Sequence, residues 1–284
     1  MSLRPENKKS IQETPLFSVT KNLFFQHHLS PDLLLHQNFC VDEDVLAAMV
    51  DTGEVGKEDV ILEIGAGTGL LTAKLAEKAK KVIAAEKDEK LKPLLQKMPK
   101  NVEIIFSDAL KVLPKIKEFN KIIVNKIIAN IPYQLAEPLL RFLCTAQQVE
   151  RTVLMVPRKF AVHAAEHPFF SAFFNFKVIA DVPREAFYPQ PKVVSAILLI
   201  TPKKEVNGSA FLLRQLFLQR DKKLKNALRE GLIAVAEWQG KKLSKKEATQ
   251  KIDQLGLSEE VLEELVGRVK LKKIGEIVKK IWTD

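Results

Sequence analysis

Short runs of apolar, mainly β-branched residues alternate with helical patterns between about residues 59 and 202. This alternation is typical of a mainly parallel β-sheet that is covered by helices on both faces. It therefore predicts an α/β domain with seven strands. The strands are expected at residues 60–64, 81–86, 102–106, 121–129, 152–156, 177–182 and 193–200, and the helices at 42–51, 70–79, 89–97, 134–147 and 158–166. Residues 183–191 leave no room for a helix between the last two strands, so we expect these strands to form an antiparallel pair.

The pattern changes after residue 202, where the strand signal ends and helical periodicity replaces it. Helices are expected at residues 209–219, 222–238, 243–254, 258–267 and 272–281. Ser244 and Glu247 have the spacing of a capping box at the start of one of these helices. We therefore divide the chain into an N-terminal arm over residues 1–34, an α/β domain over residues 35–203 and a small helical domain over residues 204–284.

Positive charge is concentrated in the helical part of the chain. Residues 203–284 carry 19 basic and 12 acidic side chains, whereas residues 1–202 carry 26 and 23. Because contacts of Lys and Arg with phosphates supply the sequence-independent part of nucleic-acid affinity, this asymmetry favours a polyanionic partner. A solvated basic face is the alternative interpretation. The candidate RNA-binding residues are Arg220, Lys222, Lys223 and Lys225.

Several other chemistries are excluded by composition and spacing. The two cysteines, Cys40 and Cys144, are too few for a disulfide framework or a structural zinc site. The five histidines lack metal-ligand spacing with supporting ligands, and no motif of a covalent nucleophile is present. No stretch approaches the roughly 20 apolar residues of a membrane span, and the first residues contain no hydrophobic signal core. We therefore expect no metal, no membrane contact and a cytoplasmic location.

A glycine-rich turn follows the first predicted strand. Residues 60–64 lead into Gly65, Gly67 and Gly69, and a helical pattern begins directly afterwards. Glycine allows the backbone to approach a ligand closely and to adopt positive φ. Leu70 stands at the position of the third glycine of the dinucleotide fingerprint, so the turn is a poor cradle for a pyrophosphate. Taken alone, such a turn is as often structural as cofactor-binding.

Acidic residues stand at the ends of the next two strands. Glu86 follows Gly65 by 21 residues, and a carboxylate at this position can accept hydrogen bonds from both hydroxyls of a ribose. Asp108 can accept from an adenine amino group, although a helix N-cap is its alternative role. Because the carboxyl ends of parallel strands meet at one edge of a sheet, these residues predict an adenosine-like ligand without phosphates. S-adenosylmethionine fits that description.

The fourth strand leads into Asn130-Ile131-Pro132-Tyr133. An exocyclic purine amine is a poor nucleophile because its lone pair is delocalised into the ring. Hydrogen bonds from this amine to the Asn130 side-chain oxygen and the Ile131 carbonyl oxygen would favour a tetrahedral nitrogen. Tyr133 can stack on an extruded base, a contact worth about 1–3 kcal/mol. These four residues are therefore the candidate catalytic residues for amine methylation, and a proline turn beside a core tyrosine is the alternative.

From about residue 35 to residue 202, the chain resembles the ribosomal RNA adenine N6-dimethyltransferase family. Besides Glu86, Asp108 and the N-I-P-Y motif, three segments carry the resemblance. Gln37-Asn38-Phe39-Cys40-Val41-Asp42 is similar to the family's cofactor-covering segment, and residues 62–72 are similar to its glycine loop. Residues 187–196 resemble the F-x-P-x-P-x-V-x-S segment that lies beside the target site in the family.

The resemblance implies a Rossmann-like class I methyltransferase sheet followed by a helical RNA-binding domain. It implies that S-adenosylmethionine is held by Gln37, Asn38, Cys40 (through its backbone), Gly65, Gly67, Glu86, Lys87, Asp108, Ala109 and Asn130. It also implies that Phe187 forms the second wall of a base pocket. The implied activity is dimethylation of two adjacent adenines near the 3′ end of small-subunit rRNA. The enzyme is expected to act as a monomer on a pre-30S-type ribosomal particle.

The segments expected to face RNA depart from the family pattern. Residues 157–163 lack the Gln, Glu and Arg that follow the fifth strand in the family, and Asp221 stands where an arginine is expected. Two alternatives therefore stay open: a large-subunit rRNA methyltransferase of the macrolide-resistance type, and a non-catalytic assembly factor that binds pre-ribosomes. Residues 120–124 are nearly repeated as residues 125–129, which is expected to lengthen the fourth strand or its exit.

Overall fold

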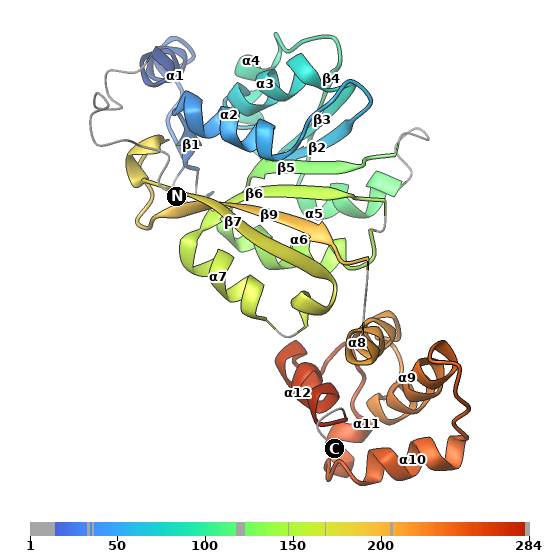
Figure 1. Ribbon diagram of the computed structural model, residues 1–284. Helices are drawn as coiled ribbons and strands as arrows, with labels where there is room; N and C mark the ends of the chain where they lie inside the picture. The colour runs from blue at the N-terminus through green and yellow to red at the C-terminus, as the bar shows by residue number, and fades with distance from the viewer. Residues whose placement is uncertain are drawn as a thin grey trace. The chain divides into compact units, whose positions relative to one another are not determined.

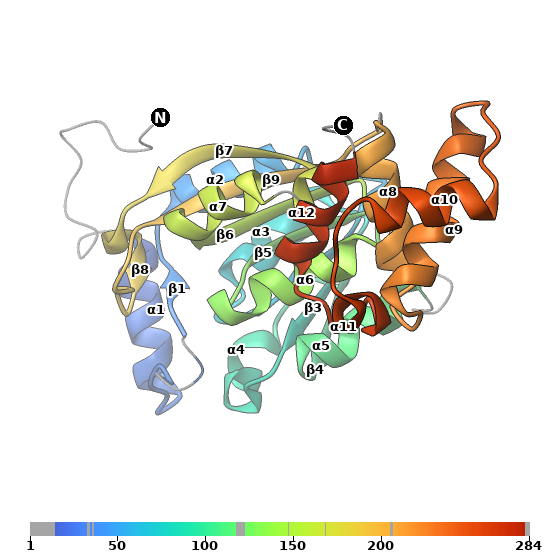
Figure 2. The same cartoon turned by 90° about the horizontal axis from the view of Figure 1, so that it is seen from below.

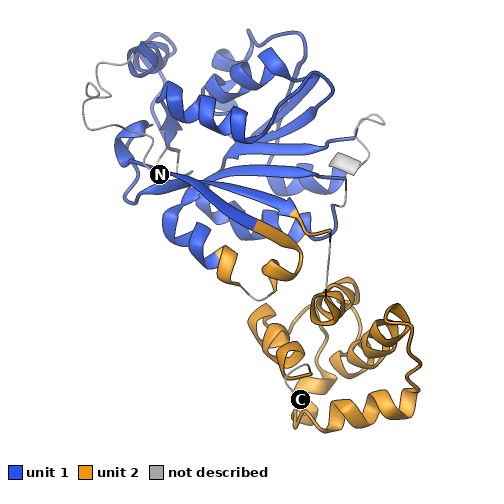
Figure 3. Ribbon diagram, viewed as in Figure 1, with its two compact units in different colours: residues 1–163, 176–201 blue, residues 164–175, 202–284 orange. Residues whose placement is uncertain are grey.

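The computed structural model of the protein describes residues 15–32, 35, 37–117, 123–146, 148–167, 169–204 and 207–281. The chain divides into two compact units, which Figure 3 shows in different colours. Unit 1 comprises residues 1–163 and 176–201, and unit 2 comprises residues 164–175 and 202–284. Unit 2 thus contains the expected helical segment and, in addition, residues 164–175, which the sequence pattern assigned to the α/β domain.

Unit 1 is built on a seven-stranded sheet with the order β4-β3-β2-β5-β6-β9-β7 (Figure 1). The strands from β4 to β6 are parallel, and β9 runs antiparallel to β6. The predicted fold class and strand number are confirmed, and the last two strands are neighbours. The bounds are β2 Val60–Ile64, β3 Lys81–Glu86, β4 Val102–Phe106, β5 Lys126–Asn130, β6 Arg151–Pro157, β7 Phe174–Val182 and β9 Ser195–Pro202.

Helices accompany the sheet, and a separate two-stranded ribbon lies beside it. The helices are α1 Pro15–Gln26, α2 Glu43–Thr52, α3 Leu70–Lys78, α4 Lys92–Leu95, α5 Ala109–Val112, α6 Ala136–Leu143 and α7 Arg158–Glu166. The ribbon consists of β1 Phe39–Cys40 and β8 Phe187–Tyr188, which pair antiparallel. All five residues of β2 are buried, as expected for a central parallel strand that is covered on both faces.

The expected strand over residues 121–129 is shorter in the structure. Residues 118–122 lie outside the described part, residues 123–125 are not in a strand, and β5 begins at Lys126. The second copy of the repeated segment therefore forms the strand. Ile123 in the first copy is 66% exposed, so its apolar side chain does not contribute a buried strand position.

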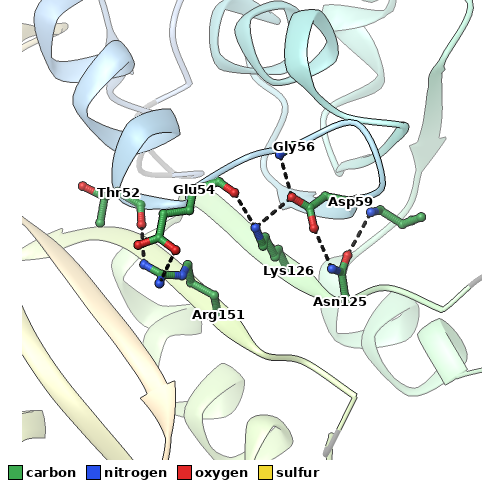
Figure 4. A network of polar contacts seen from close by, with 8 residues as sticks. Thr52, Glu54, Gly56, Asp59, Asn125, Lys126 and Arg151 are labelled. Carbon is green, nitrogen blue, oxygen red and sulfur yellow. Dashed lines mark hydrogen bonds and ion pairs between the residues drawn. The ribbon is translucent and has the colours of Figure 1, made fainter.

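A polar network lies at the amino ends of the strands, where β5 starts (Figure 4). The Asn125 side chain accepts from the Val60 N–H at 2.9 Å and donates to Asp59 at 2.7 Å. The Lys126 ammonium donates to the same carboxylate at 2.7 Å and to the Glu54 carbonyl oxygen at 2.6 Å. Asp59 and Lys126 are both buried. We call these five residues the Asp59 network, and it joins the start of β5 to the start of β2.

Helix α1 was not predicted, because the sequence analysis placed its residues in a terminal arm. Phe17, Thr20 and Phe24 recur at the spacing i, i+3 and i+7, which puts them on one helix face. The Phe24 ring lies 5.2 Å from the Phe39 ring and 6.1 Å from the Tyr188 ring. Figure 2 shows α1 alongside β1 and β8. Packing against this ribbon supplies the apolar contacts that a single short helix needs.

Unit 2 consists mainly of helices, as the periodicity predicted. They are α8 Gly208–Leu218, α9 Leu224–Trp238, α10 Lys245–Asp253, α11 Glu259–Glu263 and α12 Leu271–Ile281. The capping box of Ser244 and Glu247 is present at the start of α10. The ring of Phe169, which is fully buried, lies 5.1 Å from that of Phe173 and 5.2 Å from that of Phe217 in α8. These rings explain why residues 164–175 belong to unit 2.

No helix in the described part of the chain has the length and apolar character needed to cross a membrane.

Candidate active site

A cavity of about 130 Å3 opens where the central strands of unit 1 end. Ile64, Glu86 and Asn130 bring the carboxyl ends of β2, β3 and β5 to it, and Ser107 follows the end of β4. The cavity collects most of the predicted site residues, namely Gln37, Asn38, Gly65, Gly67, Glu86, Lys87, Asp108, Ala109, Asn130, Ile131, Pro132 and Tyr133. Cys40 and Phe187 are predicted site residues that do not line it.

The glycine turn forms the floor of the cavity in a conformation that other residues adopt only with strain. Gly65 has φ 80°, Gly67 has φ 56° and Gly69 has φ 79°. A Cβ atom at Gly67 would approach the Phe39 ring to 3.0 Å. The turn therefore requires glycine both for its dihedral angles and for the close approach of the segment that covers it.

Glu86 is held by two backbone N–H groups. Its Oε2 atom accepts from Gly67 at 2.8 Å, and its Oε1 atom accepts from Asp88 at 2.8 Å. Burial raises the pKa of the Glu86 carboxyl, and the backbone hydrogen bonds act in the opposite direction. A carboxylate has about four acceptor sites, and the backbone N–H groups of Asp88, Gly67 and Lys87 act on this one. Acceptor capacity therefore remains for a ribose hydroxyl.

Asp108 combines the two roles that the sequence left open. It is the N-cap of α5, where its Oδ1 atom accepts from the Leu110 N–H at 2.9 Å. Its Oδ2 atom lies 3.1 Å from the Lys87 ammonium. The Leu110 N–H and the Lys87 ammonium lower the pKa of the carboxyl. Asp108 is therefore an ionised acceptor at the wall of the cavity, and capping and ligand binding are compatible there.

Asn130 has its side-chain amide oriented by the segment that precedes β1. The Nδ2 atom donates to the Asn38 carbonyl oxygen at 2.9 Å. A carbonyl oxygen can only accept a hydrogen bond, so the amide nitrogen must face Asn38. The Oδ1 atom remains available as an acceptor at the edge of the cavity. This is the orientation that an acceptor for an amine N–H requires.

Tyr133 lies on the same turn, and its phenol is fixed by a residue that sequence reasoning missed. The Tyr133 hydroxyl is 2.9 Å from the Ser195 hydroxyl at the start of β9. Ser195 is fully buried, and burial raises the pKa of Tyr133. The signal for Ser195 was present, since this serine ends the F-x-P-x-P-x-V-x-S segment. Its hydrogen bond fixes one end of the aromatic side chain.

The segment that covers the cavity is tied to both of its neighbours. Gln37 donates to the Asp88 carboxylate at 2.8 Å and accepts from the Asp32 N–H at 2.7 Å. Phe39, which lines the cavity, packs in a cluster with Phe24 of α1 and with Leu91. This wall of the cavity is therefore assembled from α1, the segment before β1 and the turn after β3.

Phe187 and Cys40 are placed differently from the expectation. They are register partners in the ribbon of β1 and β8, and both are buried in the hydrophobic core. Phe187 is 2% exposed, so in this structure it does not form an open wall of a base pocket. Cys40 lines a smaller second cavity behind the glycine turn. Burial raises the pKa of its thiol to about 12. The strand pairing accounts for both placements, and no local pattern indicates strands of two residues.

Glu63 is a second residue that sequence reasoning missed. It lies in β2, two residues before Gly65, is 1% exposed and lines the smaller cavity together with Cys40. Its Oε2 atom has no hydrogen-bond partner in the described part of the chain. Burial raises the pKa of Glu63 to about 8. The signal was an acidic residue inside an otherwise apolar strand that runs into the glycine turn.

The donors and acceptors of the main cavity suit a nucleoside better than a nucleotide. The charged residues that line it are Glu86, Asp108 and Lys87, and Lys87 is paired with Asp108. Excess negative charge disfavours phosphates and favours a ligand with a cationic group. No group of three or more metal-ligating side chains occurs in the part of the chain that the structure describes. A sulfonium nucleoside therefore fits these residues.

The predicted RNA-binding residues lie in unit 2, and their charges already have partners. Lys222 forms an ion pair with Glu230, and Lys223 and Lys225 both contact Glu263. The Arg220 guanidinium lies 5.4 Å from the centre of the Phe217 ring. The three lysines are therefore neutralised more than their sequence spacing indicates, whereas Arg220 contacts an aromatic ring and not an acid.

Comparison with known families identifies the chain. The family model described as ribosomal RNA adenine dimethylase matches residues 33–254. The chain belongs to the ribosomal RNA adenine dimethylase family. The match extends from the segment that covers the cavity, through the glycine turn and the N-I-P-Y motif, into α10 of unit 2.

Individual members of the dimethylase family are similar over most of their length. The protein named "Probable ribosomal RNA small subunit methyltransferase A" from Pyrococcus abyssi is 36% identical over 226 residues, which cover 73% of this chain and 80% of that protein. The protein of the same name from Methanococcus maripaludis (strain C6) is 38% identical over 213 residues, with coverages of 68% and 79%.

Solved structures support the same fold. A dimethyladenosine transferase from Plasmodium falciparum aligns with a TM-score of 0.52 and 23% identity, covering 84% of this chain and 95% of that chain. The 23S rRNA methyltransferase ErmE aligns with a TM-score of 0.53 and 21% identity, covering 86% and 99%. At these identities the likeness establishes the fold of the dimethylase and not its substrate.

Proposed function

We propose that this dimethylase transfers methyl groups from S-adenosylmethionine to the N6 atoms of adenines in small-subunit rRNA, two to each target adenine. The observation that carries the proposal is the hydrogen bond from the Asn130 amide nitrogen to the Asn38 carbonyl oxygen. It leaves the amide oxygen as an acceptor beside a cavity whose other acceptors, Glu86 and Asp108, suit an adenosine. Membership of the family and the relatives named as small-subunit rRNA methyltransferases support this substrate.

The cofactor is held by residues of three strand ends. Glu86 accepts from the two ribose hydroxyls, and Asp108 accepts from the adenine amino group. Gly65 and Gly67 allow the backbone to approach the methionine portion, while Gln37 and Asn38 cover it. Lys87 and Ala109 complete the wall. When bound, S-adenosylmethionine supplies a methyl group attached to a positively charged sulfur.

The residues of the N-I-P-Y turn prepare the target amine. The Asn130 Oδ1 atom and the Ile131 carbonyl oxygen accept hydrogen bonds from the N–H groups of the adenine amine, two before the first transfer and one before the second, which directs its lone pair towards the methyl group. The bound cofactor would supply the methyl group and keep the electron pair of the sulfur–carbon bond, and the ammonium formed on the adenine would lose a proton to solvent. Because the nitrogen needs no strong base, positioning and hydrogen bonding supply most of the rate.

Tyr133 holds the target base by stacking, and Pro132 restricts the turn between Asn130 and the ring. The hydrogen bond from Tyr133 to Ser195 favours one orientation of the ring. Ser195 is therefore a positioning residue in this mechanism. The wall opposite Tyr133 was assigned to Phe187, but this side chain is buried in the core, so exposure of Phe187 would require the β1–β8 ribbon to rearrange.

The helical unit 2 supplies contacts with RNA phosphates, which position the substrate without reading its sequence. Its excess of basic over acidic side chains supports this role. We propose that the enzyme acts as a monomer on a pre-30S-type particle in the cytoplasm.

The decisive experiment uses ribosomal particles from a strain that lacks this gene product. Small and large subunits are incubated separately with the purified protein and S-adenosylmethionine, and modified adenines are mapped by mass spectrometry and primer extension. Two dimethylated adenines near the 3′ end of small-subunit rRNA are expected. Modification of the large subunit alone would replace the proposal with the macrolide-resistance type of activity.

The non-catalytic alternative is tested by cofactor binding. Calorimetry with S-adenosylmethionine is expected to give a saturable heat signal that is lost in Glu86→Ala. If the wild-type protein binds pre-ribosomal particles but gives no signal at millimolar cofactor, it is an assembly factor and not an enzyme.

A further inference from the structure

Unit 2 presents an exposed tryptophan that is stacked on a second aromatic ring. Trp238 ends α9 and is 49% exposed. Its ring lies 5.2 Å from that of Phe211 in α8, and the two planes differ by 15°. This parallel stack covers one face of the indole, and about half of the residue stays exposed. The stack fixes the ring without burying it, so the indole is preorganised for a further planar group.

Four lysines follow this tryptophan within eight residues: Lys241, Lys242, Lys245 and Lys246. All four are exposed, and none forms an ion pair with another residue of the described part of the chain. Glu247, the neighbouring acid, accepts hydrogen bonds from Ser244 in the capping box. We call residues 241–246 the lysine loop, and it carries four positive charges and no negative one.

The lysine loop is held close to Trp238 by an ordered turn. Gly240 has φ 71°, and Lys241 donates its N–H to the Ala236 carbonyl oxygen at 2.8 Å. These are features of a glycine C-cap that ends α9. Lys245 and Lys246 stand in the first turn of α10, where the helix dipole disfavours positive charge. Folding of the unit therefore gives no electrostatic reason for lysines at these positions.

The RNA-binding lysines predicted from the sequence differ from the lysine loop because they have acidic partners. Lys222, Lys223 and Lys225 each contact a glutamate, so binding a phosphate there would first require an ion pair to be broken. The lysine loop has no such competition from a residue of the described chain. Phosphates would therefore gain more from the lysine loop than from Lys222, Lys223 and Lys225.

We propose that Trp238 and the lysine loop form a binding site for an unpaired stretch of RNA. One base stacks on the open face of the indole, and the flanking phosphates contact the lysines. Single-stranded nucleic-acid sites commonly combine these two elements, because every base offers a stacking face and the backbone offers charge. A base in a duplex is already stacked on both sides, so it has no free face to stack on the indole. This inference rests on the proposed function only in taking RNA as the substrate.

The test measures tryptophan fluorescence in the full-length chain. The chain has two tryptophans, Trp238 and Trp282. In a W282F background, the signal comes from Trp238 alone. A single-stranded oligouridine of about ten nucleotides, within the usual size of such sites, is expected to quench it saturably. A duplex of the same length is expected to bind without comparable quenching. Quenching by the duplex and the single strand to the same extent would overturn the proposal.

Two sets of variants separate stacking from charge. W238A is expected to weaken oligouridine binding between about 5- and 150-fold, the range for one lost base–aromatic stack, whereas W238F is expected to retain part of the affinity. K241Q/K242Q/K245Q is expected to reduce the salt dependence, d log K/d log [salt], by about 2, since each phosphate contact with a single strand contributes about 0.7. The matched control K222Q/K223Q/K225Q removes the same formal charge and should change this slope less. Equal slopes in the two triple variants, or unchanged binding by W238A, would refute the site.

Failure of this inference can be distinguished from failure of the proposed function. N130A is expected to retain Trp238 quenching, because Asn130 belongs to unit 1. Methylation of rRNA without quenching would exclude the Trp238 site alone. Quenching without methylation of any rRNA would exclude the proposed activity alone.

Discussion

Removal of the Lys126 ammonium is expected to destabilise unit 1 through the Asp59 network (Figure 4). The side chains of Lys126 and Asp59 are 10% and 12% exposed. In K126M, the Asp59 carboxylate stays buried and keeps only its hydrogen bonds from Asn125 and the Gly56 N–H. Breaking a buried pair by removing one partner costs about 3–5 kcal/mol. The two remaining bonds compensate part of this cost, so we expect a loss of about 3 kcal/mol.

The assay is urea or thermal unfolding of the full-length chain. Unfolding is monitored with a signal that reports on the sheet of unit 1. For a domain of about 150–250 residues, 1 kcal/mol lowers Tm by about 2–4 °C, so K126M should lower Tm by about 6–12 °C. The double variant K126M/D59N removes the uncompensated charge and should be more stable than K126M alone.

The control is K80M, because the ion pair of Lys80 with Glu58 is 3.4 Å long and exposed. Its removal should cost less than about 1 kcal/mol. A loss below 1 kcal/mol in K126M, or a double variant that is less stable than K126M, would contradict the reasoning.

The shifted pKa of Asp59 also makes the stability of unit 1 depend on pH. Burial acts to raise it, but the hydrogen bonds from Lys126 and Asn125 and the Gly56 N–H lower it overall. The contribution of Asp59 to stability should therefore be present above its ordinary pKa of 3.8 and be lost as the pH falls through the lower folded-state value.

Three further predictions concern the two cavities. Asn130→Ala should leave the Kd for S-adenosylmethionine within a few-fold of wild type, because the cofactor contacts of Glu86 and Asp108 remain, and should remove most turnover; unchanged turnover would reject its role. Glu86→Ala loses hydrogen bonds worth about 1.5–3 kcal/mol each from a charged acceptor, so calorimetry should give at least a tenfold weaker affinity, and an unchanged Kd would exclude the ribose contact. Burial raises the pKa of Glu63 from 4.5 to about 8, so the folded state binds the Glu63 proton more tightly than the unfolded chain. The contribution of Glu63 to stability should be fully present below about pH 4.5 and decline as the pH rises towards 8. Chemical denaturation at pH 5, 7 and 9 should show a smaller decline for Glu63→Gln than for the wild type. Parallel stability curves for the two proteins would count against the raised pKa.

The sequence predicted the parts of the molecule that depend on local pattern. The strands near residues 60–64, 81–86 and 102–106 coincide with β2, β3 and β4, because apolar runs between turn residues determine buried parallel strands directly. Most cavity residues were predicted for the same reason, since they lie where such strands end. Helix α1 was missed because its stability depends on the Phe39 and Tyr188 rings, which are distant in sequence.

The parts that the sequence did not predict depend on partners brought together by folding. Phe187 is buried because its strand pairs with Cys40, and nothing in the local pattern of either segment indicates that pairing. Lys223 and Lys225 have basic neighbours in sequence, but Glu263 reaches them from α11. Charge runs therefore indicate a basic unit without indicating which cations remain accessible. The start of β5 was also misplaced, because both copies of the repeated segment begin with Asn-Lys and continue with two isoleucines, so the local pattern does not distinguish them.

That repeat has a consequence for how errors in folding would affect the chemistry. If the upstream copy took the place of Lys126 beside Asp59, the chain would shift by five positions and Asn125 would arrive where Asn130 now stands. An asparagine would still follow the strand, but lysine and isoleucine would come next instead of Ile131 and Pro132. Such a misfolded form would keep a nearly identical apolar strand and lose the aromatic ring needed to hold a base. Because both copies begin with Asn-Lys, the shifted chain would offer Asp59 the same two partners, so the buried charge pair at one end of the sheet does not by itself protect the catalytic turn at the other.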